Sequence, residues 1–179
     1  MKKIDIFKMI IILMCVISFI GLLLPYQKSI GEYREYLQEN PDRFNVKEVD
    51  ITNEDAIDVT IIENFKVYSY AMNDDQSDFI RGTSIINVML IIILVASTAF
   101  ILIFILRNKK ILSIIFSILL LGSSLLMNAD IVDRGVMPSS RYTYGISYYL
   151  YPIAAVVMLI SIIITIVKDR KNNKMKSNK

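Results

Sequence analysis

The sequence has no histidine, no tryptophan and a single cysteine, Cys15, among its 179 residues. Without histidine, the chain cannot build a Ser-His-Asp triad, a His-Glu-x-x-His zinc site or a haem ligated by histidine. A lone cysteine excludes a Cys-x-x-Cys redox pair and any intramolecular disulfide. The chain also lacks a Gly-x-Ser-x-Gly elbow and a Gly-x-x-x-x-Gly-Lys phosphate loop. We therefore predict no catalytic residue, no cofactor and a function that is not enzymatic.

Four long stretches of the chain contain no charged residue. Hydrophobic residues make up 54% of the sequence and are concentrated in these stretches, which cover 9–24, 84–106, 111–127 and 149–167. As helices, runs of this length measure roughly 24 to 35 Å, close to a hydrocarbon thickness of about 30 Å. We therefore predict four transmembrane helices. The missing charges argue against ion-coupled transport by a single copy, because transporters of that kind keep ionisable groups inside the membrane.

Basic residues are distributed unevenly between the segments that join these runs. Residues 1–8, 107–110 and 168–179 hold twelve Lys and Arg against two Asp and Glu, whereas 26–83 and 128–148 hold eight against fifteen. Because basic loops stay in the cytoplasm, we predict that both termini are cytoplasmic and that the acidic block is extracytoplasmic. All ten tyrosines fall in that extracytoplasmic half, where an interfacial aromatic belt belongs.

The predicted fold class is an all-α membrane core of four transmembrane helices with a small α+β extracytoplasmic domain. The first helix lacks a small-x-small cleavage site after it and is interpreted as an uncleaved anchor. The predicted segments are a cytoplasmic N-terminus 1–8, helix 9–25, acidic domain 26–83, helix 84–106, cytoplasmic loop 107–110, helix 111–127, extracytoplasmic loop 128–148, helix 149–167 and a basic cytoplasmic tail 168–179. The expected location is the plasma (cell) membrane of a bacterium, since the isoleucine-, lysine- and asparagine-rich composition is typical of AT-rich bacterial genomes.

The first half of the acidic domain carries helix signals around an extended segment. The spacing Ser29-x-x-Glu32 is that of a capping box and predicts a helix that Asn40 and Pro41 end. Residues 44–51 are predicted to be extended, with a slip in the apolar phase between Val46 and Val49.

The second half of the acidic domain alternates between apolar and polar residues. This alternation predicts two strands, 57–61 and 65–69, in a hairpin. A helical interpretation of 53–64 stays open, because Thr52-x-x-Asp55 could cap such a helix. A two-stranded hairpin alone is marginal in water, and Arg141–Tyr144 alternates as well, so we predict a third strand there and a sheet shared by the two outer loops.

Candidate binding residues are few. We predict no metal site; the closest candidate is Asp74, Asp75 and Asp78, whose oxygens suit calcium but which lack the turn glycine and late glutamate of an EF-hand loop. For partner contact we predict the aromatic and apolar residues Phe65, Val67, Tyr68 and Tyr70, although these could instead cover their own sheet.

Small polar residues in the second and third apolar runs have two interpretations. Ser113 and Ser117 form a small-xxx-small pair that favours close helix packing. Alternatively, several copies could assemble a pore whose lining would be Asn87, Ser97, Thr98, Ser113, Ser117, Ser123 and Ser124.

Four spans, a long first outer loop with strands and a tiny basic inner loop resemble the topology of the claudin-like tetraspan families. The resemblance stops at topology, because the chain has no tryptophan and no cysteine in that loop. We therefore expect an accessory subunit or scaffold that forms homo- or hetero-oligomers with membrane proteins, or else a pore-forming or export component. The lipid bilayer is an expected partner, with anionic headgroups at the basic tail, and nucleic acid is not.

Overall fold

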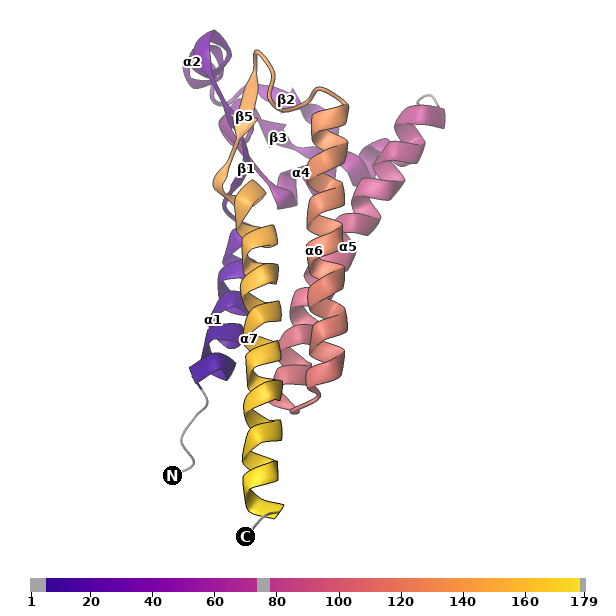
Figure 1. Ribbon diagram of the computed structural model, residues 1–179. Coiled ribbons are helices and arrows are strands. Elements are labelled where there is room, and N and C mark those ends of the chain that lie inside the picture. The colour runs from indigo at the N-terminus through magenta and orange to yellow at the C-terminus, as the bar shows by residue number, and fades with distance from the viewer. Residues whose placement is uncertain (1–5, 74–77, 178–179) are drawn as a thin grey trace.

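The polypeptide forms a bundle of four long helices with a small sheet at one end (Figure 1). The computed structural model describes residues 6–73 and 78–177, apart from the side chains of residues 78 and 172–177. The bundle helices are α1 (Ile6–Gly21), α5 (Asp78–Leu106), α6 (Lys110–Asp133) and α7 (Ile146–Ser177). We call the end with the sheet the sheet end, and the opposite end, where residues 107–110 lie, the basic end.

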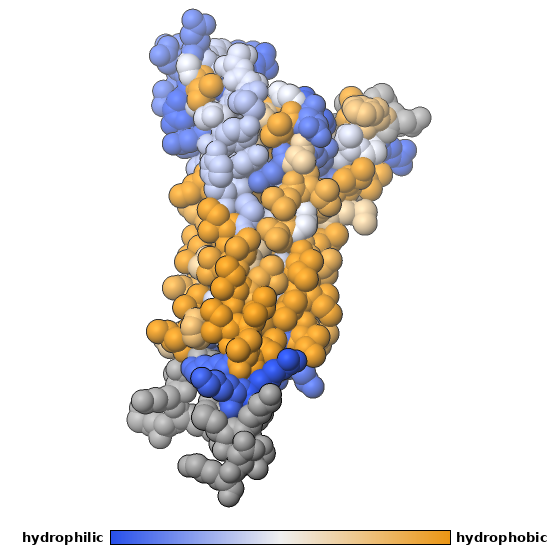
Figure 2. All heavy atoms as spheres, in the orientation of Figure 1, coloured by the Kyte–Doolittle hydropathy of each residue, from blue (hydrophilic) through white to orange (hydrophobic). Residues whose placement is uncertain are grey.

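Three of the bundle helices are long and apolar enough to cross a membrane, over Phe79–Leu106, Lys110–Asp133 and Ile146–Lys171. Helix α1 is equally apolar but has 16 residues, which as a helix measure roughly 24 Å. It packs against α5 and α7, while α6 packs against the same two helices from the other side. On the face seen in Figure 2, apolar side chains cover the bundle between a charged band at the basic end and the polar sheet end. The chain is therefore a multi-pass membrane protein.

Small polar residues of the bundle helices are directed inward. Every serine and threonine between residues 84 and 167 that lies in α5, α6 or α7 is buried, whereas the exposed positions of these helices are mostly isoleucine and leucine. Many of these hydroxyls donate to their own helix, as Ser117 Oγ does to the Ser113 carbonyl at 2.8 Å. Because these hydroxyl groups are hydrogen-bonded within their own helices, the small residues let neighbouring helices approach closely. The outer surface of the bundle is therefore formed by larger apolar side chains that suit hydrocarbon.

A three-stranded antiparallel sheet joins distant parts of the chain at the sheet end. Its strands are β4 (Asp58–Thr60), β1 (Pro25–Ser29) and β5 (Tyr142–Tyr144), with β1 in the middle. Gln27 of β1 pairs with Val59 on one side and with Tyr144 on the other. The strand predicted at 141–144 is confirmed, and the two loops do share a sheet.

The predicted hairpin of 57–61 and 65–69 is wrong, because its second strand is a helix. Only Asp58–Thr60 is extended, and α4 (Ile61–Ala71) begins immediately afterwards. Thr60 and Glu63 form a capping box in which the Glu63 carboxylate accepts a hydrogen bond from the Thr60 backbone at 2.6 Å. This cap starts a helix at the point where the alternating pattern indicates a strand.

The predicted capping box at Ser29 and Glu32 is also wrong. Ser29 ends β1, and its hydroxyl donates to the Ile57 carbonyl at 2.8 Å. Helix α2 (Gly31–Glu39) still follows, with Ile30 at its N-cap and no side-chain cap, and it ends at Asn40 as predicted. Because the Ser29 hydroxyl is bonded to the last residue of α3, it does not cap α2.

Between α2 and β4 the chain is more broken than the predicted extended segment. Strands β2 (Phe44–Val46) and β3 (Ile51–Thr52) pair, and a 3₁₀ turn, η1 (Lys47–Val49), separates them at the predicted slip in phase. Thr52 does cap a helix through Asp55, α3 (Asn53–Ile57), but that helix stops well before residue 64.

The bundle helices also extend past the apolar runs. Helix α5 begins six residues before Ser84, and α6 continues to Asp133. A helix satisfies its own backbone hydrogen bonds in lipid and in water, so its end does not mark the membrane surface.

Candidate functional site

A charged and polar cluster connects three helices at the sheet end. Arg134, at the C-cap of α6, forms an ion pair with Asp130 one turn earlier, at 2.6 Å. It also donates to the hydroxyl of Tyr68 on α4 at 2.8 Å, and its guanidinium lies 5.4 Å from the centre of that ring. Asn87 on α5 donates to the same Asp130 carboxylate at 2.9 Å. One carboxylate and one guanidinium therefore hold α4, α5 and α6 together.

A second polar group connects the sheet to α6 and α7. The hydroxyl of buried Tyr26, on β1, donates to Asn128 on α6 at 2.7 Å, and Asn128 donates to the Tyr148 carbonyl on α7 at 3.0 Å. The neighbouring Gln27 donates to Asn64 on α4 at 3.2 Å. Hydrogen bonds therefore link the middle strand of the sheet, β1, directly to α4 and α6 and, through Asn128, to α7.

Both clusters connect elements of the fold. Burial raises the pKa of Tyr68, and the neighbouring Arg134 only partly opposes this effect. The phenol therefore stays protonated at neutral pH and is not a base. Within 6–73 and 78–177, no group of three or more His, Cys, Asp and Glu residues could hold a metal ion. Of the calcium candidates, Asp74 and Asp75 lie outside the described residues, as does the side chain of Asp78, so that prediction stays untested.

An apolar groove of about 390 Å³ lies between α4 and α5 near the end of α1. Ile62 and Phe65 of α4 line one side and are 37% and 36% exposed, while Ile92 of α5 lines the other and is 53% exposed. Its remaining lining residues are also apolar, namely Leu22, Ile61, Ile91, Val95 and Ala96. The groove suits an apolar occupant and offers no polar anchor.

The four residues predicted for partner contact do not share one surface, because α4 is a helix and not a strand. Phe65 lines the groove. Tyr68 points instead to Arg134 and is half-buried. Val67 is half-buried, and Tyr70 is 39% exposed at the last turns of α4.

The sheet-end half of α5, beyond the groove, carries further exposed apolar residues. It leans away from α6 in Figure 1 and is partly orange in Figure 2, at the level of the polar sheet region. Phe79, Ile86 and Met89 are 73%, 54% and 56% exposed there. Arg81 lies among them and is exposed. Sequence reasoning missed this surface because it treats 84–106 as a uniform span.

Ser113 and Ser117, predicted to pack helices, are both fully buried on α6. The sequence analysis did not single out Arg134 and Asp130, although their i,i+4 spacing just beyond an apolar run is the signal that could have found them.

Comparison with known proteins found no family model, no curated protein and no solved structure that matches this chain. The site must therefore be interpreted from its own geometry.

Proposed function

We propose that this chain is a non-enzymatic, four-span protein of the plasma membrane that acts as an accessory subunit or scaffold. In this proposal both termini are cytoplasmic, and the sheet end is extracytoplasmic. A transmembrane segment of a partner membrane protein docks along the groove between α4 and α5 and along the sheet-end half of α5.

One observation carries the docking proposal, namely the exposed apolar surface beside the polar sheet region. Helix α5 has 29 residues and as a helix measures roughly 43 Å, longer than a hydrocarbon core of about 30 Å. Tilt absorbs part of this excess, but the exposed Arg81 indicates that this end of α5 is at the headgroups or in water. Lipid tails do not cover Phe79 at that end, where it is 73% exposed, and exposed apolar surface of this kind is typical of a protein interface.

Helix α1 supports the fourth span. Ile11, Cys15 and Ser18 face the bundle and are buried, whereas Leu13 and Ile20 are 57% and 51% exposed. After Gly21 the chain continues through hydrogen-bonded turns to Leu24, which lengthens the apolar segment toward the sheet. A helix with one face in the bundle and an apolar outer face fits a membrane span.

The pore alternative receives no such support. All seven residues proposed to line a pore between copies are buried within a single chain, with exposures of at most 3%. Residues that already face the interior of one bundle are not available to line a channel between bundles.

The proposal is tested by extraction from the native host in mild detergent, followed by the identification of co-purifying chains. We expect a defined membrane protein, a second copy or a different chain, to remain bound to the wild type. Ile62→Lys places a charge in the groove and should release it. Phe44→Lys alters an apolar residue that is 48% exposed on β2, away from the groove, and should retain it. Equal retention by both variants would overturn the groove as the docking site.

A further inference from the structure

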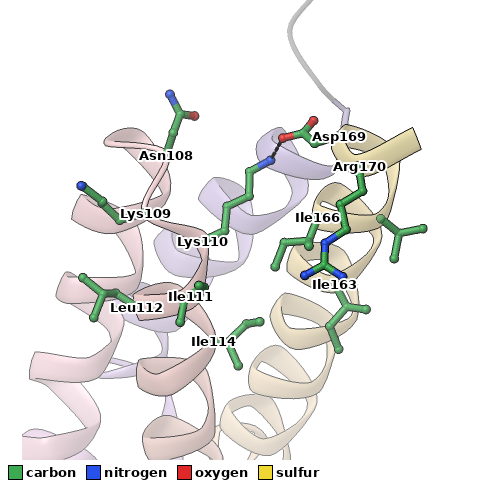
Figure 3. A pocket seen from close by; sticks show the side chains of 11 residues that line it. Asn108, Lys109, Lys110, Ile111, Leu112, Ile114, Ile163, Ile166, Asp169 and Arg170 are labelled. Atoms are coloured by element: carbon green, nitrogen blue, oxygen red, sulfur yellow. Dashed lines mark hydrogen bonds and ion pairs between the residues drawn. The ribbon is translucent and has the colours of Figure 1, made fainter. Parts of the chain in front are cut away.

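A second groove, of about 760 Å³, lies at the basic end between the first turns of α6 and the last apolar turns of α7. Its walls are apolar and include Ile114 of α6 with Ile163 and Ile166 of α7. Its rim is charged and carries Lys109, Lys110, Asp169 and Arg170. Figure 3 shows the rim above the isoleucine walls, so the groove is polar at its mouth and apolar in its depth.

The charges of this rim do not cancel. Lys110 is ion-paired with Asp169 across the mouth of the groove. Lys109 and Arg170 form no ion pair with any side chain that the structure describes, so the rim has an excess of positive charge. Figure 3 shows the Arg170 side chain extending from α7 toward the groove, with its guanidinium beside Ile163.

Two further features add positive potential at the same place. Helix α6 begins at Lys110, and no side-chain hydrogen bond caps its N-terminus. Its first backbone N–H groups and the positive end of its dipole therefore point toward the rim. Lys8, in the first turn of α1, also approaches, because it donates to Asn108 at 3.3 Å.

We propose that this groove binds one anionic phospholipid, with its phosphate at this cationic rim and an acyl chain between α6 and α7. A cationic rim above an apolar cleft between membrane helices has the two-part chemistry of such a lipid. A free phosphate would match the rim and leave the isoleucine walls uncovered, and a zwitterionic lipid would match the walls and leave the charge excess of the rim. This site lies at the opposite end of the bundle from the α4/α5 groove and does not depend on the proposed partner.

The test measures lipid retention by the full chain in native mass spectrometry from detergent, with phosphatidylglycerol and phosphatidylcholine of the same acyl chains. The wild type should retain phosphatidylglycerol at least about tenfold more tightly than phosphatidylcholine. The double variant Lys109→Ala/Arg170→Ala should lose about tenfold or more of that affinity, since each cation near the surface contributes. Lys171→Ala removes one exposed charge of the same end that does not line the groove, and should change retention by less than about twofold.

A gain-of-function variant keeps the proposal falsifiable even if the double variant is unstable. Asp169→Asn removes the carboxylate that pairs with Lys110 and should tighten phosphatidylglycerol binding. Equal retention of the two lipids, or an equal loss in Lys171→Ala and the double variant, would overturn the proposal in favour of a diffuse attraction to the tail. Competition by inorganic phosphate at millimolar concentrations would overturn it in favour of a free-anion site.

Discussion

Arg134, at the end of bundle helix α6, contacts Tyr68 on α4, the helix that begins beside the sheet. The guanidinium donates to the phenol hydroxyl at 2.8 Å and lies 5.4 Å from the ring centre, while Asp130 holds its other side at 2.6 Å. These two residues are 66 positions apart in the sequence. Their contact fixes α4, and with it one wall of the α4/α5 groove, relative to α6.

We expect Arg134→Ala to destabilise the protein by about 2 kcal/mol, because it removes a partly buried ion pair and a hydrogen bond to a charged donor. The matched control is Arg43, which donates to the hydroxyl of Tyr36 at 2.9 Å but on the exposed surface. Arg43→Ala should cost less than about 0.5 kcal/mol. Thermal unfolding in detergent, followed by circular dichroism, compares the two. Equal costs would show that the Arg134 contact adds nothing beyond a surface pair.

Gly145→Ala should loosen the sheet. An added Cβ at Gly145 would lie 2.2 Å from the Pro25 carbonyl oxygen, so the backbone of β1 or β5 must shift. The shift also strains the hydrogen bond from Gly145 N–H to the Tyr26 carbonyl at 2.9 Å. We expect a loss of about 1 to 3 kcal/mol, as for other overpacked sites. Gly82 on α5 has no atom within 4 Å of such a Cβ, and Gly82→Ala should instead stabilise by up to about 1 kcal/mol. Thermal unfolding in detergent measures both effects. If Gly145→Ala left the free energy of unfolding unchanged, the tight approach of β1 and β5 would be contradicted.

Stability should fall at alkaline pH. Burial raises the pKa of Tyr26, Tyr68 and Tyr142 above the ordinary tyrosine value. The folded state then keeps protons that the unfolded state releases above about pH 10, so the free energy of unfolding is constant below that pH and decreases as pH rises further. Unfolding midpoints measured from about pH 8 to about pH 11 test this. Tyr142→Phe removes one contributor and should make the decrease shallower; an equally steep decrease would contradict the burial of that phenol.

The proposed orientation predicts which residues a membrane-impermeant maleimide can reach. In a Cys15→Ser background, Ser140→Cys places a thiol at the exposed sheet end and Asn108→Cys places one at the exposed basic end. We expect labelling of the first in intact cells and of the second only after permeabilisation. The reverse pattern would show that the charge-based orientation is inverted, and labelling of both would indicate that the two ends share a side.

Sequence-based prediction is correct for most features that depend on local patterns. Uninterrupted apolar runs predicted the bundle helices, and the Thr52-x-x-Asp55 spacing left open, as the alternative to a strand, a capped helix that α3 realises in part. It failed where distant segments decide the outcome. Strand β1 has no alternation of its own and exists because β4 and β5 pair with it. A local signal was also missed, because the Thr60-x-x-Glu63 capping box starts α4 inside a pattern that resembles a strand. This helix places Phe65 in the groove and Tyr68 against Arg134.

The central claim, that a partner docks along α4 and α5, is tested most directly by photocrosslinking in the native membrane. A benzophenone amino acid replaces Phe65 or Ile92, which line the groove, or Ile160, which is 53% exposed on α7 and outside the groove. The proposal predicts one protein adduct of defined mass at Phe65 and Ile92 and none at Ile160. The same adducts at all three positions, or no protein adduct at Phe65 and Ile92, would contradict it.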